Sequence, residues 1–165
     1  MKTTYITVIL MITFLCSSRN LFAAPEEIYF NPGIKLGYSF GKNGGFVWGL
    51  EFSVTTVISR SYNQGLLIGA VVDIDFCRNW RRVHFGIESS PFGIDYLCAG
   101  IDIGPSITTI DTHTYYGFSV IPYLGAGAYP YFNYTFTGKD SLGLFELGSY
   151  IKIPIPTSGN TNHFH

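Results

Sequence analysis

The sequence predicts an all-β protein that folds as a single antiparallel up-and-down transmembrane β-barrel of about eight strands. Successive segments alternate apolar and polar residues with a period of two, which is typical of strands with two unlike faces. Charged residues make up only 13% of the chain and aromatic residues 17%, a balance that suits a surface in contact with hydrocarbon. After the N-terminal region, no segment has the length and apolar character of a transmembrane helix, and no long stretch follows the helical period.

The first 23 residues are predicted to be a cleaved secretory signal peptide. Lys2 supplies the positive charge at the start, and residues 5–16 supply an apolar run that is short for a transmembrane helix. Cleavage is expected after Ala23. A lipoprotein anchor at Cys16 is the alternative, and the bulky residues before it make this alternative the weaker one.

The rest of the chain is expected to form a barrel domain over residues 24–155 and a polar C-terminal tail over residues 156–165. Removal of the signal peptide leaves Cys77 and Cys98, for which a disulfide and two unlinked thiols are both open. The net charge of −1 gives no reason to expect a nucleic-acid partner.

The alternation places the strands in order along the chain. The expected ranges are 33–42, 45–57, 65–77, 81–90, 92–104, about 115–125, 128–137 and 143–155. The longest connection falls at 105–115, and Pro122 predicts a bulge in the sixth strand because proline donates no ladder hydrogen bond. With no helical crossover between them, the strands should form an antiparallel meander.

Either face of these strands could point outward. In a soluble lipocalin-like barrel the aromatic face would be the core, whereas in a membrane barrel it would face lipid. Three observations favour lipid: the polar faces are rich in glycine, aromatic residues gather near strand ends, and the polar-face charges have both signs. The residues predicted to form a structural polar network in the lumen are Lys35, Glu51, Asp73, Asp75, Arg82, His84, Glu88, Glu146 and Lys152.

Residues that lie opposite each other in a hairpin share a face of the sheet. Whether the polar positions carry odd or even numbers therefore predicts how the hairpins pair. A three-residue turn over residues 43–45 would place Lys42 opposite Phe46 and Gly37 opposite Glu51. A four-residue loop over residues 78–81 would place Asp75 opposite His84. A loop over residues 138–141 would place Asn133 opposite Glu146.

The signal peptide, the meander of about eight strands and segments such as 45–54, with aromatic residues on one face and Gly, Ser and Glu on the other, resemble the small outer-membrane β-barrel families of Gram-negative bacteria. The resemblance implies a bacterial outer-membrane location, insertion from the periplasm with both termini left there, and the lipid bilayer as partner, with lipopolysaccharide as an open further one. One feature departs from these families, many of which end on an aromatic residue in the last strand. Here a polar tail follows the last strand.

Small outer-membrane barrels include lipid A-modifying enzymes, some of which use a serine, a histidine and an acidic residue together. His113 lies near Asp111 and Ser119 in the expected long connection, and His84 has acidic neighbours without a serine partner. No metal-ligand spacing or phosphate-binding loop is present, and no cofactor or metal is expected. The predicted function is therefore a structural or interaction barrel with a filled polar lumen, and enzymatic activity is not favoured. A deacylase-like lipid A-modifying enzyme and a secreted lipocalin-like barrel that binds a small apolar ligand remain the alternatives.

Overall fold

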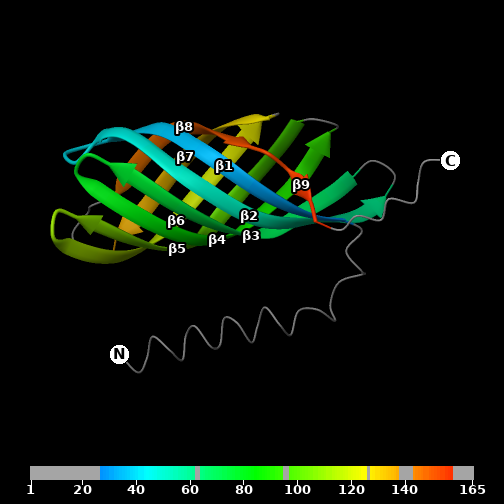
Figure 1. The fold of residues 1–165 in the computed structure, drawn as a ribbon, viewed down its shortest axis with the longest axis horizontal. Coiled ribbons are helices and arrows are strands. Elements are labelled where there is room, and N and C mark those ends of the chain that lie inside the picture. Colours follow the sequence, from blue (N-terminus) through cyan, green and yellow to red (C-terminus); the bar gives the residue numbers. More distant parts are fainter. Residues whose placement is uncertain (1–26, 62–63, 95–96, 126, 138–142, 158–165) are drawn as a thin grey trace, which may run out of the picture.

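In a computed structural model the chain forms a closed barrel of eight antiparallel strands, to which a short ninth strand is added (Figure 1). The structure describes residues 27–61, 64–94, 97–125, 127–137 and 143–157. The predicted signal peptide and most of the predicted tail lie outside these ranges. The strands are β1 (Glu27–Phe40), β2 (Gly45–Ser61), β3 (Gln64–Cys77), β4 (Trp80–Ile94), β5 (Leu97–Ile110), β6 (His113–Gly125), β7 (Ala128–Thr137), β8 (Leu144–Lys152) and β9 (Ile155–Pro156).

Each strand pairs with its neighbours in the sequence, and β1 also pairs with β8, which closes the barrel. The strand β9 pairs with Tyr29 and Phe30 of β1. Just beyond β9, the backbone N–H of Thr157 donates to the carbonyl oxygen of Ile28 at 2.9 Å. The up-and-down meander follows from short connections, which can join antiparallel strands but not parallel ones. The predicted fold class is confirmed. Among the described residues, no helix is long and apolar enough to cross a membrane.

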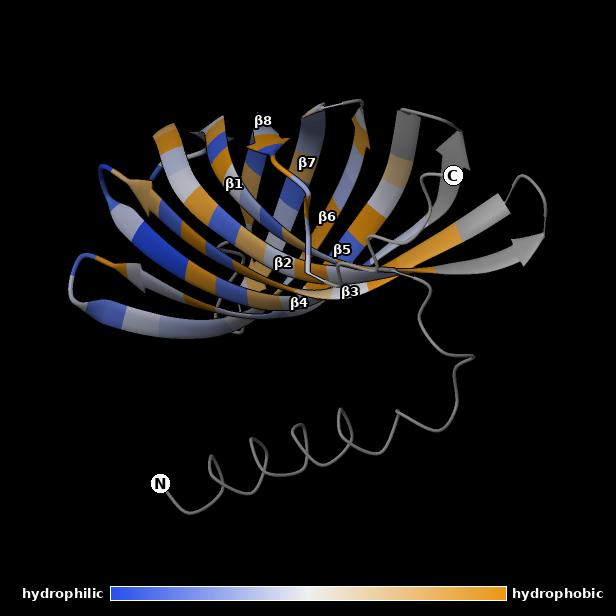
Figure 2. Ribbon diagram, turned by 45° about the vertical axis from the view of Figure 1, so that its right-hand side comes forward, coloured by the Kyte–Doolittle hydropathy of each residue, from blue (hydrophilic) through white to orange (hydrophobic). Residues whose placement is uncertain are grey.

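Apolar side chains cover the outer wall, and polar side chains are buried inside the barrel. In the ribbon coloured by hydropathy, apolar and polar residues alternate along the strands (Figure 2). The large exposed apolar residues include Ile34, Leu36, Tyr38, Phe46, Trp48, Leu50, Phe52, Val54, Phe85, Ile87, Ile103, Phe118, Leu147 and Ile151. Transfer of apolar surface from water to hydrocarbon is favourable by about 25 cal/mol per Å². The wall is therefore built to face lipid, the opposite of the soluble lipocalin-like alternative.

Several predicted strand boundaries are wrong. The strand β1 begins at Glu27 rather than at residue 33, and β2 continues to Ser61 rather than to residue 57. The strand β4 continues to Ile94, and β5 runs to Ile110, so the expected connection over residues 105–115 is mostly strand. The connection that remains is a two-residue turn between β5 and β6. Asp111 in that turn has a φ of 53°, a left-handed conformation that a short polar side chain tolerates.

The predicted bulge at Pro122 is also wrong. The strands β6 and β7 keep one register on both sides of Pro122, and Pro122 itself lies opposite Ile101 of β5. The register shifts instead between Ser89 and Phe92 of β4, a segment that contains Pro91, and near the end of β2. A bulge at this position accommodates a residue that cannot donate to the ladder.

In the first hairpin the same residues face inward as predicted, but the turn is different. Ser39 lies opposite Gly45, and Glu51 lies opposite Gly33, so the predicted pairs of Lys42 with Phe46 and of Gly37 with Glu51 are wrong. The turn begins at Gly41, whose φ of 102° favours glycine, and the N–H of Gly44 donates to the Gly41 carbonyl at 3.0 Å. The pairing moves by two residues on each strand, and the inward and outward faces are unchanged.

The hairpin of β3 and β4 also differs from the prediction, here by one residue on each strand, so that the partner of each residue moves by two positions. Asp75 lies opposite Arg82, and Asp73 lies opposite His84, so the predicted pair of Asp75 and His84 is wrong. The last hairpin pairs Asn133 with Glu146, which confirms the prediction, although its loop lies outside the described residues.

The two cysteines of the barrel lie at opposite ends of it. Cys77 ends β3, and Cys98 lies near the start of β5, opposite Gly125 of β6. A disulfide requires Cα atoms within about 7 Å of each other, so these positions are too far apart within one barrel. Cys77 is a free thiol.

Candidate functional site

The candidate site is the barrel lumen. The structure places all nine residues predicted for the lumen inside the barrel, on β1, β2, β3, β4 and β8. Eight of them are buried, and the side chain of Lys152 is only 10% exposed. The large buried side chains Trp80, Ile121 and Tyr150 fill further space around them. An eight-stranded barrel has an interior that side chains can fill.

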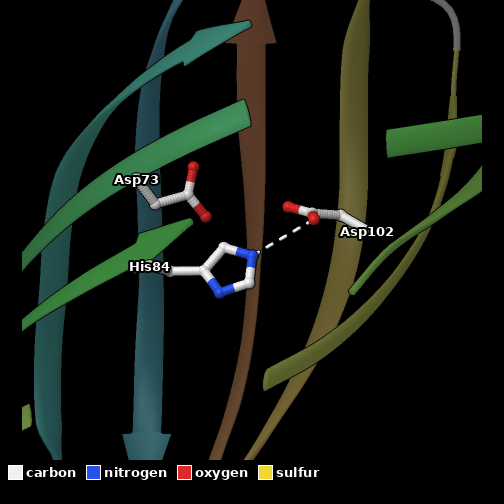
Figure 3. A group of neighbouring side chains, drawn as sticks. All are labelled: Asp73, His84 and Asp102. Carbon is white, nitrogen blue, oxygen red and sulfur yellow. Dashed lines mark hydrogen bonds and ion pairs between the residues drawn. The ribbon is translucent and has the colours of Figure 1, made fainter. Parts of the chain in front are cut away.

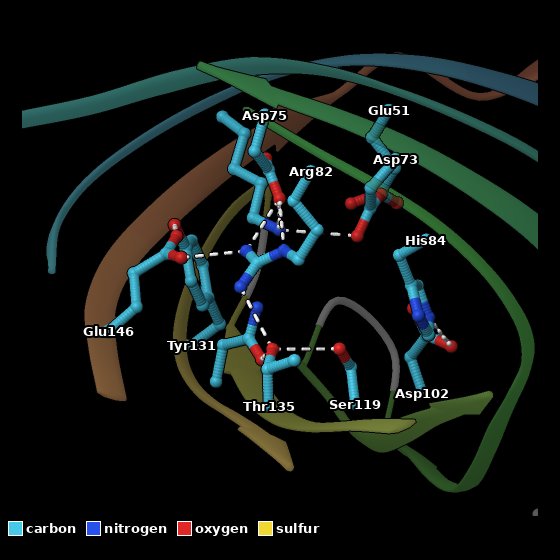
Figure 4. Close-up of polar contacts among 12 residues, drawn as sticks. Glu51, Asp73, Asp75, Arg82, His84, Asp102, Ser119, Tyr131, Thr135 and Glu146 are labelled. Carbon is cyan, nitrogen blue, oxygen red and sulfur yellow. Dashed lines mark hydrogen bonds and ion pairs between the residues drawn. The ribbon is translucent and has the colours of Figure 1, made fainter. Parts of the chain in front are cut away.

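Arg82 is the centre of the largest group of contacts (Figure 4). Its Nη2 atom lies 2.6 Å from Oδ2 of Asp75 and 2.7 Å from Oε2 of Glu146, and its Nε atom donates to the same Asp75 oxygen at 3.0 Å. Its Nη1 atom donates to Thr135 at 3.0 Å. Arg82 therefore joins strands β3, β7 and β8 across the lumen. The hydroxyl of Tyr131 also donates to Glu146, through the other carboxylate oxygen.

The two lysines join further strands. Lys35 of β1 lies 3.2 Å from Asp73 and 3.3 Å from Asp75, both on β3. Lys152 of β8 forms ion pairs with Glu51 of β2 and with Glu88 of β4, the latter at 2.7 Å. Buried charges are stable only when they are paired and hydrogen-bonded. Together with Arg82, these pairs connect strands β1, β2, β3, β4, β7 and β8.

His84 contacts a carboxylate that was not among the predicted site residues. Its Nε2 atom lies 3.1 Å from Oδ1 of Asp102 on β5 (Figure 3). The sequence does show Asp102 on the polar face of its strand, between Gly100 and Gly104. The pattern did not identify its partner, because the register of β4 against β5 depends on the bulge near Pro91.

The structure does not build a nucleophilic site from these residues. Ser106 lies opposite His84, but its hydroxyl and the Nδ1 atom of His84 are both without a hydrogen-bond partner. Ser106, His84 and Asp102 are all buried in the lumen, away from the lipid face. The other set named from the sequence is not brought together: His113 and Asp111 are exposed at the rim, whereas Ser119 is inside the lumen and contacts Thr135.

No protein-family model matches the sequence, and no curated protein matches it. Among solved structures, the chain is similar to Neisserial surface protein A (NspA), with 10% identity over 79% of this chain and 99% of that chain and a TM-score of 0.51. It is also similar to Ail, the attachment invasion locus protein of Yersinia pestis, with 8% identity over 77% of this chain and 98% of that chain and a TM-score of 0.46.

The similarity to NspA shows the fold and confirms the resemblance to small outer-membrane β-barrels. An outward apolar wall on this fold agrees with the predicted location in a bacterial outer membrane.

Proposed function

We propose that this protein is a non-conducting outer-membrane barrel with a structural or interaction role in the cell envelope. The observation that carries the proposal is the position of Arg82, whose guanidinium group binds Asp75, Glu146 and Thr135 across the lumen. A conducting path would require these charges to separate in a medium of low dielectric constant. Breaking a buried ion pair by removing one partner typically costs about 3–5 kcal/mol. The lumenal charges thus serve as internal cross-links.

The connections at one end of the barrel support an interaction through the wall rather than through loops. The strand pairs β1–β2, β3–β4 and β5–β6 are joined, at the end away from the chain termini, by only four, two and two residues. Receptors and adhesins usually bind through longer loops on a rigid scaffold. The proposed contacts are therefore the lipid bilayer and, as a further partner, lipopolysaccharide along the outward apolar face.

Conductance measurements test this proposal. Protein purified from outer membranes in detergent would be inserted into planar lipid bilayers, and its folded state would be checked by heat-modifiable gel migration. We expect folded protein that is found in the outer membrane and gives no discrete conductance steps. Discrete steps from the folded protein, or recovery of the protein as a water-soluble monomer without detergent, would overturn the proposal.

The enzymatic alternative is tested with the variant His84→Gln. A structural role predicts less folded protein or lower stability, with the acyl-chain pattern of lipid A in intact cells unchanged. The exposed variant His113→Gln is the matched control. Normal folding of His84→Gln together with a lost lipid A modification would make the protein an enzyme.

A further inference from the structure

We propose that Asp73, His84 and Asp102 form a binding site for one divalent transition-metal ion inside the barrel. Each residue offers one ligand atom, and the three atoms lie within 4.8 Å of one another. The side chains come from three adjacent strands, β3, β4 and β5, and converge on one point of the lumen (Figure 3). The spacing of these residues in the sequence does not suggest a metal site, because the ligands meet only across strands.

The separation of the His84 and Asp102 ligand atoms is close to that of two ligands on one ion. Two ligand atoms at about 2.0–2.1 Å from a tetrahedral ion lie roughly 3.3 Å apart. The distance between Nε2 of His84 and Oδ1 of Asp102 is 3.1 Å. Asp73 would have to approach by about 1.5 Å at most, which a rotation of its carboxylate can supply.

A glycine makes room for this meeting point. A Cβ atom at Gly86 would lie 1.9 Å from Oδ1 of Asp102 and 2.5 Å from Nε2 of His84. The space between the two ligand atoms thus exists only because residue 86 has no side chain. Gly86 faces the lumen between His84 and Glu88 of β4, a position that any larger residue would fill.

The charge balance of the lumen favours a cation at this place. Among the described residues, six carboxylates are buried in the lumen, together with three lysine or arginine side chains, Lys35, Arg82 and Lys152. Asp102 has no lysine or arginine partner among its ion pairs, and Oδ1 of the buried Asp73 has no hydrogen-bond partner. Uncompensated charge in a low dielectric is costly, so the excess must be offset by protons or by a bound cation.

The donor set indicates the class of ion. One imidazole nitrogen and two carboxylate oxygens suit borderline ions such as zinc, and they leave a fourth position open. The carboxylates of Glu51 and Glu88 belong to the same half of the lumen and are held by Lys152. The three ligands are buried, so we expect the ion to be taken up as the barrel folds.

Zinc retention tests the site. Protein purified from membranes would be stripped of metal in urea and chelator and refolded in detergent with zinc. Free zinc would then be removed, and bound zinc would be measured by mass spectrometry. His163 and His165 would be replaced by glutamine throughout, because paired histidines near a chain end can bind zinc on their own. The informative variants are His84→Gln and Asp102→Asn, and the matched controls are His113→Gln and Asp111→Asn, at exposed positions of the rim.

We expect about one zinc ion per folded barrel in the parent protein and in both controls, and a loss of about tenfold or more in the two lumenal variants. X-ray absorption at the zinc edge of the parent protein gives a test that does not depend on whether the variants fold. It should show one imidazole nitrogen and oxygen ligands at about 2.0–2.1 Å. No retained zinc, equal retention in His84→Gln, or a spectrum without imidazole would each overturn the proposal. The first of these results would mean that protons alone balance the lumenal charge.

Discussion

Replacing Arg82 with methionine should destabilise the barrel strongly. Methionine has a comparable side-chain volume, although it is shorter, and it removes the charge that faces Asp75 and Glu146. Asp75 keeps its ion pair with Lys35 at 3.3 Å. Among the described residues Glu146 keeps the hydrogen bond from Tyr131 but loses its one ion pair, so it becomes the less compensated group. Leaving one buried charge without its partner costs about 3–5 kcal/mol. We therefore expect the free energy of unfolding of Arg82→Met to fall by about that amount.

A second substitution separates lost packing from unpaired charge. In the double variant Arg82→Met/Glu146→Gln the orphaned carboxylate becomes an amide, which can still accept the Tyr131 hydroxyl. Removing an unsatisfied buried charge should restore about 2 kcal/mol or more. The control is Arg81→Met, which alters the neighbouring arginine on the exposed outer side of the same strand.

Urea unfolding in lipid vesicles measures these differences. Gel migration measures folding. Tryptophan fluorescence adds a measure of insertion, to which Trp48 on the exposed wall and the buried Trp80 beside Arg82 both contribute. If Arg82→Met is as stable as Arg81→Met, the ion pairs do not hold the lumen together. If the double variant is less stable than Arg82→Met, the loss comes from packing rather than from unpaired charge.

Two further perturbations test the wall and the lumen. Leu50→Arg should lower the free energy of unfolding by about 2–4 kcal/mol near the bilayer midplane, and the control Tyr116→Arg, close to the end of its strand, by about 0–1 kcal/mol. Equal losses in vesicle unfolding would refute the assignment of the outward wall to lipid. Gly86→Ala should lower stability by about 1–3 kcal/mol, because its Cβ would lie 1.9 Å from an oxygen of Asp102. The control Gly33→Ala should cost less, since the nearest atom to its Cβ lies at 3.1 Å; matching losses in the two variants would contradict this account of residue 86.

The faces of the strands could be predicted from the sequence because side-chain direction in a strand has a strict period of two. Once a residue such as Trp48 is assigned to the wall, its neighbours Val47 and Gly49 must point inward, and they do. The same parity correctly paired Asn133 with Glu146 across the last hairpin. The glycine-rich polar faces, the aromatic residues near strand ends and the mixed charges of the polar faces then favoured lipid on the other face.

The strand ends were harder to predict because turn chemistry competes with alternation there. Residues 105–110 also alternate, with Ser106 and Thr108 inside and Ile107 outside, yet the proline at 105 and the polar residues around 111 suggested a loop. The two-residue turn depends on Asp111 adopting a positive φ. A positive φ at one residue depends on its tertiary surroundings and cannot be predicted from the alternation of apolar and polar residues.

What the sequence determined by itself is the kind of barrel, the alternation of its strands and the outward apolar wall. What only the tertiary structure decided is which of the lumenal charges meet. A hairpin that slides by two residues keeps every side chain on its face, so alternation cannot distinguish Asp75 opposite His84 from Asp75 opposite Arg82. The choice depends on the turn geometry and on the direct ion pair that the observed register makes. The contact between His84 and Asp102 also requires the bulge in β4 and the absence of a side chain at Gly86. Both features depend on contacts between strands, so the alternation within one strand cannot reveal them.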